Sequence, residues 1–187
     1  MTEGLFLREV RLVAERYPTV AYDEQLVDSM AALLVRDAAR FDTVVTTNMY
    51  GDILSDEAAE LSGSLGLAAS INAGDQHCMA QAQHGSAPDI AGQDRANPSS
   101  LILSTGMLLG WLGQRRQHAA MERAEGMIER AVDAVIADPA QRTADLGGPL
   151  GTTAFAAAVV REIVRADRKS TRLNSSHIPL SRMPSSA

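Results

Sequence analysis

The chain has 187 residues, 45% of them hydrophobic and 21% charged, with one cysteine and a formal net charge of −6. This composition is typical of a globular protein of one or two domains. It excludes a membrane-spanning helix, because no apolar run reaches ~18 residues. The acidic balance argues against a nucleic-acid partner. The lone cysteine, Cys78, excludes an internal disulfide and, with no visible secretory signal, indicates a cytoplasmic location.

The first 62 residues alternate helical and extended patterns. An amphipathic helix is predicted to end before Pro18, and a second helix is predicted over 27–40. The β-branched run at 43–47 is typical of a buried strand of an α/β sheet. In chain order we expect a helix over 6–17, a strand over 20–22, a helix over 27–40, a strand over 43–47, a turn over 48–51 and a helix over 52–61 that is interrupted by glycines.

The next 104 residues begin with a stretch, 70–98, that is rich in Gly, Asn, Asp, Ser and Pro and is predicted to be a long irregular loop. Residues 101–112 are apolar on all sides and indicate a buried helix. An amphipathic helix is predicted over 121–137. A final helix is expected to follow the Gly147–Gly148 turn, with Thr152 as its N-cap and Phe155, Val159 and Ile163 on its apolar face. We detect no internal repeat.

The C-terminal residues 167–187 differ from the rest, because they are serine-rich, lack an amphipathic period and contain the single lysine, Lys169. This pattern favours a disordered tail. Asp167 to His177 also matches the in-frame translation of a common sequencing-library adapter, so we hypothesise that 167–187 is non-native. The other 166 residues carry 13 arginines and 22 acidic residues, a net charge of −9.

Asp52 and Asp56 are the first candidates for a functional role. Carboxylates four positions apart lie on one face of a helix and can share a hard cation. The alternative is that both only favour the N-terminal end of a helix through its dipole. Asp28, at the start of the preceding helix, is either a third oxygen ligand or that helix's cap.

The second candidate is the run from His84 to Gly92, HGSAPDIAG, followed by Asn97-Pro98. Its small residues let a ligand approach the backbone, and Asp89 could accept hydrogen bonds from a ribose diol. The run is not a GxGxxG turn, so it does not match the Rossmann fingerprint. A plain surface loop is the alternative interpretation.

Three linked motifs resemble one known family. The run from Phe41 to Glu57, FDTVVTTNMYGDILSDE, together with HGSAPDIAG and Ala96-Asn97-Pro98, is similar to the metal-dependent β-decarboxylating dehydrogenases, which include the isocitrate, 3-isopropylmalate and tartrate enzymes. The order and spacing of the motifs match across residues 1–166. The resemblance covers about the C-terminal half of such a protein.

The resemblance implies an α/β fold of the isopropylmalate dehydrogenase type, with two domains and a homodimer. Residues 1–62 would belong to the dimer-forming domain and 63–166 to the nucleotide-side domain, both incomplete. It also implies that Asp52 and Asp56 bind Mg²⁺ or Mn²⁺, and that Asp28 reaches the metal and substrate of the partner subunit. The metal would stabilise the alkoxide of the 2-hydroxy acid substrate and the enolate formed on loss of CO₂.

The same resemblance assigns the nucleotide loop, with Asn97 near the adenine. Asp89 would hold the ribose hydroxyls and repel a 2′-phosphate, which predicts NAD over NADP as cofactor. One departure is Gln81, where the family usually has an acidic residue. The loop residues matched are His84, Gly85, Ser86, Ala87, Asp89, Ile90 and Asn97.

The family's catalytic lysine, general-acid tyrosine and substrate-binding arginines have no counterparts in this sequence. We therefore expect the chain as given to be inactive, with no catalytic residue of its own, and to aggregate or fold poorly in isolation. Two alternatives to an enzyme fragment are a non-catalytic regulatory or assembly subunit of the same fold and a truncated product without independent function. No nucleic-acid or membrane partner is expected.

Overall fold

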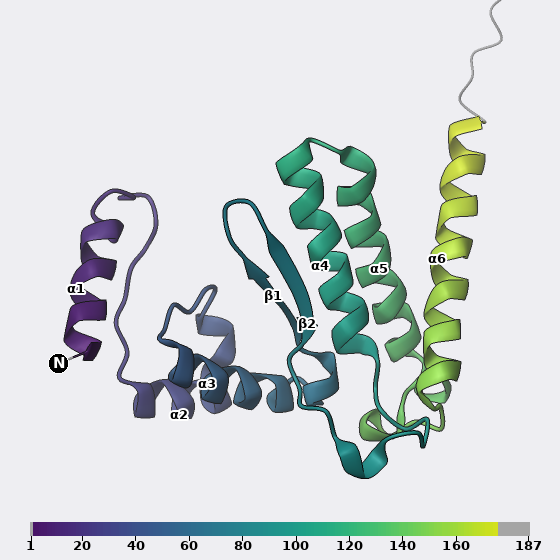
Figure 1. Ribbon diagram of the computed structural model, residues 1–187, viewed down its shortest axis with the longest axis horizontal. Coiled ribbons are helices and arrows are strands. Elements are labelled where there is room, and N and C mark those ends of the chain that lie inside the picture. The colour runs from purple at the N-terminus through teal and green to yellow at the C-terminus, as the bar shows by residue number, and fades with distance from the viewer. Residues whose placement is uncertain (1, 176–187) are drawn as a thin grey trace, which may run out of the picture. The chain divides into compact units, whose positions relative to one another are not determined.

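The computed structural model describes residues 2–175 (Figure 1). The chain divides into two compact units, Met1–Gly63 and Ser64–Ala187. The sequence analysis predicts a domain boundary between residues 62 and 63. That the units are the dimer-forming and nucleotide-side domains stays a prediction. Among the described residues, no helix has the length and apolar character needed to cross a membrane.

Unit 1 contains the three helices predicted for it. They are α1 (Thr2–Ala14), α2 (Val27–Asp37), which continues into the short 3-10 helix η1 (Ala38–Arg40), and α3 (Asn48–Leu61). Helices α2 and α3 pack against each other, and their buried apolar residues are Met30, Leu54 and Ala59. Arg11 of α1 forms an ion pair with Glu24 at 2.5 Å, which ties α1 to the extended segment that follows it.

The two strands predicted in unit 1 are absent. Residues 20–22 and 43–47 carry no strand assignment, and within the described chain no strand pairs with them. A strand forms only when a neighbour accepts and donates the ladder hydrogen bonds, so a β-branched run alone leaves an extended segment. Val44 and Val45, predicted to be buried, are 47% and 66% exposed.

Helix α3 begins four residues earlier than predicted. The expected turn 48–51 is its first turn, closed by a hydrogen bond from the Gly51 N–H to the Thr47 carbonyl at 2.8 Å. Asp52 therefore lies in the second turn, where an interaction with the helix dipole is weaker than in the first. The helix ends where predicted, because Gly63 adopts φ +125°, a conformation that glycine accepts readily.

The predicted irregular stretch in unit 2 begins with a hairpin. Strands β1 (Ala69–Ala73) and β2 (Cys78–Ala82) pair antiparallel, with Ser70 opposite Gln81. The prediction of a loop over 70–98 is thus wrong up to residue 82. Strand propensity is low in ASINA and CMAQA, so tertiary contacts with α4 decide their conformation.

Helix α4 (Ser99–Arg116) packs through small residues rather than large apolar ones. Its buried positions are all serine or glycine, whereas Leu101 is 52% exposed, so the prediction of a helix buried on all sides is wrong. The Ser104 hydroxyl accepts from the Ser70 N–H at 2.9 Å and donates to the Gln81 carbonyl at 2.8 Å, bridging both strands. The Ser100 hydroxyl donates to the Ala68 carbonyl.

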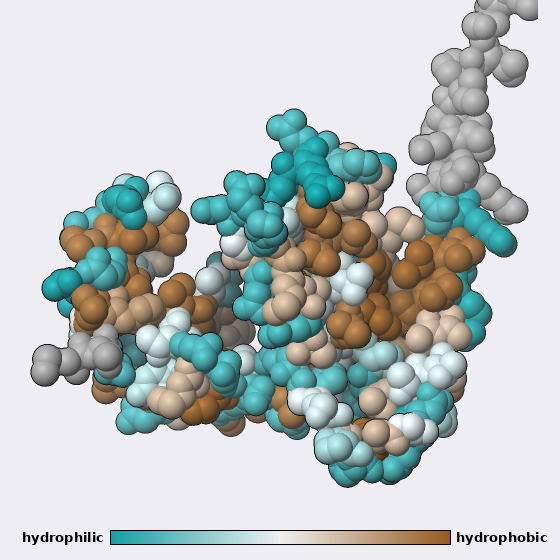
Figure 2. Space-filling model, viewed as in Figure 1, coloured by the Kyte–Doolittle hydropathy of each residue, from teal (hydrophilic) through white to brown (hydrophobic). Residues whose placement is uncertain are grey.

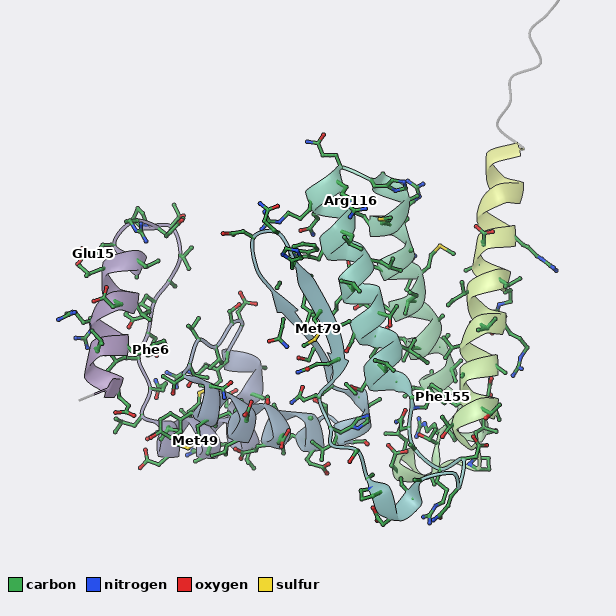
Figure 3. The ribbon with its side chains drawn as sticks, viewed as in Figure 1. Phe6, Glu15, Met49, Met79, Arg116 and Phe155 are labelled. Carbon is green, nitrogen blue, oxygen red and sulfur yellow. The ribbon has the colours of Figure 1, made fainter. Side chains whose placement is uncertain are left out.

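The core of unit 2 lies between α5 (Ala119–Ala137) and α6 (Thr152–Ser175). Phe155, labelled in Figure 3, is fully buried with Val132, Val135 and Val159. The predicted amphipathic character of α5 and the predicted apolar face of α6 are confirmed. The predicted N-cap is wrong, because the Thr152 hydroxyl donates to the Ala96 carbonyl at 2.5 Å and the α6 amides are capped by Asp94.

The C-terminal tail also differs in part from the prediction. Helix α6 continues to Ser175, so residues 167–175 are helical where disorder was expected. A helix already nucleated by Phe155 and its neighbours extends at little cost through arginine, lysine and leucine. Residues 176–187 lie outside the described part of the chain, and the proposed adapter origin stays a prediction.

Apolar side chains remain exposed in unit 1. Leu5, Leu12 and Val13 of α1 are 52%, 51% and 44% exposed, and brown apolar patches lie among teal ones over this helix in Figure 2. Few residues of the unit are fully buried. These features agree with the expectation that the isolated chain aggregates, which stays a prediction.

Replacing Gly113 by alanine tests the close packing of α4 on α5. A Cβ there would lie 2.7 Å from Glu122 Cγ and 2.8 Å from the Glu122 backbone nitrogen. Since overpacking costs about 1–3 kcal/mol and alanine returns up to about 1 kcal/mol of helix propensity, we expect Gly113→Ala to lower the unfolding free energy by about 1–2 kcal/mol. Urea unfolding followed by circular dichroism measures this. Gly4→Ala in α1, with no atom within 4 Å, is the control and should not destabilise; equal effects would contradict the packing argument.

Candidate functional site

The predicted metal ligands all lie in unit 1. Asp52 and Asp56 are exposed and stand one turn apart on α3, and Asp28 is exposed in the first turn of α2. The Asp28 carboxylate accepts from the Ser29 N–H at 2.8 Å. In the part of the chain that the structure describes, no three His, Cys, Asp or Glu side chains converge on a possible metal position. Among the described residues, the three aspartates thus do not converge on one position, and their role as metal ligands stays a prediction.

The α3 pair nevertheless suits a hard divalent cation. Mg²⁺ and Mn²⁺ prefer carboxylate oxygens, and Mg²⁺ commonly takes one or two of them while keeping water and substrate oxygens as its other ligands. Two carboxylates at positions i and i+4 of an exposed helix face provide such a partial donor set. The role that the resemblance gives Asp28, as a ligand supplied by a partner subunit, stays a prediction.

The predicted nucleotide loop lies in unit 2 and joins β2 to α4. His84 is half-buried, and its Nδ1 lies 2.9 Å from the Gly85 carbonyl oxygen. Ala87 adopts φ +42°, which turns the chain into the short 3-10 helix η3 (Pro88–Ile90). Asp89 on this helix has an exposed side chain. The loop thus presents small residues, exposed backbone and one exposed carboxylate. Its exposed members are Gly85, Ser86, Ala87 and Asp89, with Ile90 half-buried.

Hydrogen bonds from outside hold this loop at three points. At its start, the Gln83 N–H donates to the buried Ser100 hydroxyl at 3.2 Å. In its second half, Asp94 binds the first turn of α6. At its end, the Asn97 amide binds the Asp145 carboxylate at 2.9 Å. A loop fixed at its start, middle and end is ordered before any ligand binds, which lowers the entropy cost of binding.

Asp94 is the middle anchor. Its Oδ1 accepts from the Thr153 N–H at 2.8 Å and the Thr153 hydroxyl at 2.7 Å, and its carbonyl accepts from the Thr152 N–H at 3.0 Å. Asp94 has φ +53°, and a Cβ at Gly151 would lie 2.4 Å from the Asp94 carbonyl oxygen, so this contact requires glycine there. The hydrogen bonds from Thr153 hold the pKa of Asp94 below its ordinary value of 3.8.

Asn97 is the end anchor and is 7% exposed. Its Oδ1 accepts from the Ser99 N–H at 3.0 Å while its Nδ2 donates to Asp145. The predicted adenine-side residue is therefore already held by internal hydrogen bonds on both ends of its amide. The contact of Asn97 with adenine stays a prediction.

Sequence reasoning missed the anchoring residues Asp94, Asp145, Ser64 and Ser100. Asp94 and Thr153 lie 59 positions apart and Asn97 and Asp145 48, and no local pattern signals pairs at that distance. One signal was available for Asp94, because α6 begins after Gly151 without a capping side chain immediately before it.

Comparison with known proteins identifies the family. Residues 1–163 match the family model described as isocitrate/isopropylmalate dehydrogenase. The chain belongs to this family. The crystal structure of isocitrate dehydrogenase from Methylococcus capsulatus superposes with a TM-score of 0.79 and 42% sequence identity, over 86% of this chain and 46% of that chain. The predicted fold class is therefore confirmed.

Similar proteins carry several substrate names. The chain is 47% identical over 163 residues to isocitrate/homoisocitrate dehydrogenase of Thermus thermophilus, covering 87% of this chain and 46% of that protein. It is 41% identical over 162 residues to 3-isopropylmalate dehydrogenase of Methanothermobacter thermautotrophicus, covering 87% of this chain and 47% of that protein. The chain thus spans about half the length of the curated relatives it matches.

The Asp94 anchor gives a pH-dependent prediction. Because the pKa of Asp94 is lowered in the folded chain, its carboxylate stabilises the fold above pH 3.8, and this contribution disappears as the pH falls through the lower folded pKa. Asp94→Ala should therefore lower the unfolding midpoint at neutral pH, and the difference from the unmodified chain should shrink below pH 3.8. Thermal unfolding across this range tests it, with the exposed Asp75→Ala as control. A difference that is constant with pH would contradict the assignment.

Proposed function

We propose that these residues belong to an NAD- and Mg²⁺- or Mn²⁺-dependent dehydrogenase that oxidises and decarboxylates a 2-hydroxy acid carrying a β-carboxylate. The observation that carries the proposal is the match of residues 1–163 to a family whose relatives are named for isocitrate, homoisocitrate and 3-isopropylmalate. These substrates share the same reacting group: a carbon that bears a hydroxyl is bonded to a carbon that bears a carboxylate. We expect the protein to act in the cytoplasm.

The metal would be held by Asp52 and Asp56 on the exposed face of α3, with Asp28 supplied by a second subunit of a homodimer. When bound, a divalent ion withdraws electron density from the substrate oxygens during oxidation and loss of CO₂. The extended segment 43–47, with Val44 and Val45 exposed, could accept a neighbouring strand from another part of the protein.

The nucleotide would bind to the anchored loop between β2 and α4. The Asp89 carboxylate is exposed there and can accept hydrogen bonds from both hydroxyls of a ribose. The same charge disfavours a 2′-phosphate, so the loop supports NAD over NADP. Small residues from Gly85 to Ala87 leave room for close approach of the cofactor.

The substrate is the least constrained part of the proposal. The MYGDILSDEA run favours a 3-isopropylmalate-like substrate, with isocitrate and tartrate or malate as alternatives. The identities of 47% and 41% to relatives with different substrate names do not separate these options. The family's substrate-binding arginines have no counterpart in this chain, so it holds little of the pocket that would discriminate.

The chain by itself should not turn over substrate, because its sequence offers no lysine outside 167–187 to act as the catalytic base. A non-catalytic regulatory subunit is the second candidate function. The retained Asp28, Asp52 and Asp56 favour the catalytic alternative, since a subunit without a metal site has no need of these carboxylates.

The proposed activity is tested on the intact protein that contains residues 1–166. We expect NADH formation, measured at 340 nm, that requires Mg²⁺ or Mn²⁺ and a 2-hydroxy acid with a β-carboxylate. Asp56→Asn should lower kcat/KM by about a hundredfold or more, because the substitution removes a charged metal ligand. Asp37→Asn, an exposed aspartate outside the site, is the matched control. An intact protein that folds but forms no NADH with any such acid would support the regulatory alternative instead.

Cofactor choice is a separate prediction. The ratio of kcat/KM for NAD to that for NADP should be at least about tenfold, because the Asp89 carboxylate repels the 2′-phosphate. Asp89→Asn removes the charge and keeps the shape of the side chain. It should therefore lower the ratio, mainly by raising kcat/KM for NADP. Steady-state kinetics with both cofactors measure this. A preference for NADP in the unmodified enzyme would refute the role of Asp89.

A further inference from the structure

One carboxylate outside the predicted site makes contact with the end of the nucleotide loop. Oδ2 of Asp145 accepts from the Asn97 amide at 2.9 Å and from the Ser64 hydroxyl at 2.5 Å. Ser64 and Asn97 are 8% and 7% exposed, so both donors are almost fully removed from water. Losing the shared acceptor would leave two buried polar groups without their partner, which is costly.

The carboxylate also decides how the Asn97 amide is oriented. An ionised carboxylate accepts hydrogen bonds and donates none, so the NH₂ group of Asn97 must face Asp145 and its oxygen must face the Ser99 N–H. Burial raises the pKa of Asp145, but the hydrogen bonds that its carboxylate accepts, that from Ser64 foremost, together more than offset this, and the pKa lies below its ordinary value. Asp145 is therefore charged at neutral pH.

The position of Asp145 is itself fixed. It lies in the 3-10 helix η5 (Ala144–Leu146), within a tight turn closed by hydrogen bonds from the Gly148 N–H to the Thr143 carbonyl and from the Leu150 N–H to the Arg142 carbonyl, both 2.9 Å. A Cβ at Gly148 would lie 2.3 Å from the Arg142 carbonyl oxygen, so the turn is closely packed. Such a turn provides a rigid support for a carboxylate that orients another residue.

Asn97 is confined on its other side as well. A Cβ at Gly66 would lie 2.7 Å from the Asn97 Cβ, and the Gly66 N–H donates to the Ser64 hydroxyl at 3.0 Å. Gly66, Ser64, Asp145 and Asn97 thus form a continuous buried network around the last residue of the loop. The network leaves the Asn97 side chain one orientation.

We propose that Asp145 is a positioning residue for adenine-nucleotide binding: through Asn97 it fixes the last part of the loop in the arrangement that receives the nucleotide. The inference rests on the proposed role of the loop in binding NAD. Asp145 itself need not touch the cofactor. It keeps the Asn97 amide orientation and the backbone before α4 the same with and without a nucleotide. The loop therefore loses little conformational entropy on binding.

The test uses the 187-residue chain and ADP-ribose, which is NAD without its nicotinamide ring. Isothermal titration calorimetry of Asp145→Ala should give a dissociation constant about tenfold weaker than that of the unmodified chain, the size of effect expected on losing a charge-assisted hydrogen bond. Asp145→Asn keeps an acceptor and should stay within about threefold. Asp138→Ala is the matched control, because that carboxylate also has a lowered pKa and caps a 3-10 helix, yet contacts none of the loop.

A reversal of the pair separates positioning from general destabilisation. Asn97→Asp places a second carboxylate against Asp145 and should weaken ADP-ribose binding by about tenfold or more. Adding Asp145→Asn restores a donor and an acceptor with their roles exchanged, and binding should recover to within about threefold. The side-chain amide signal of Asn97 in ¹H–¹⁵N spectra should shift in Asp145→Ala and in the unmodified chain on addition of ADP-ribose.

Each result has a defined meaning. Binding by folded Asp145→Ala that equals the unmodified chain, or equal weakening in Asp138→Ala, would overturn the positioning role while leaving the proposed function intact. Failure of the double variant to recover would also overturn it, and this arm applies even if Asp145→Ala does not fold. No ADP-ribose binding by the folded, unmodified chain would contradict the proposed nucleotide loop itself, and the inference with it.

Discussion

The close approach that helix α4 allows on two sides is the constraint on which unit 2 depends. Its serines at 100 and 104 replace large side chains and satisfy backbone groups at the open end of the hairpin. Gly106, Gly110 and Gly113 on another side face Ile128, Glu125 and Glu122 of α5. A larger residue at one of the three glycines would push α4 away from α5. A larger residue at Ser100 or Ser104 would remove a hydroxyl that binds the hairpin backbone. The predicted nucleotide loop starts after β2 and ends at α4, so its geometry follows from this packing.

The sequence predicted the elements that carry their own periodicity and failed where a partner decides the structure. Helices α1, α2, α5 and α6 were found because apolar residues repeat along one face. The hairpin was missed because ASINA and CMAQA have little strand propensity and depend on Ser100 and Ser104, more than 15 residues away. The strand at 43–47 was predicted from strong propensity and is absent because no described segment pairs with it. Strand propensity and strand pairing are separate requirements. The hairpin has pairing with little propensity, and segment 43–47 has propensity without a pairing partner among the described residues.

The candidate site divides in the same way. Short linear motifs predicted Asp52, Asp56 and the loop around Asp89 as candidates, because each motif is local in the sequence. The residues that hold this loop in place are distant in sequence and chemically ordinary, namely Ser100, Asp94 and Asp145. A single sequence contains no pattern for hydrogen bonds across 48 or 59 positions, so only the fold shows them.

The anchoring of the loop also explains why its own sequence can be so plain. A loop made of Gly, Ser, Ala and Pro has few side chains with which to define its conformation, and its backbone would be costly to order on binding. Here the order is supplied from outside, by Ser100 at one end, the α6 amides in the middle and Asp145 at the other end. The exposed side chains of Ser86 and Asp89 lie between these anchors and are not part of them, so they face solvent. Because distant residues fix the shape of the loop, its own solvent-facing side chains can be small while its backbone stays rigid.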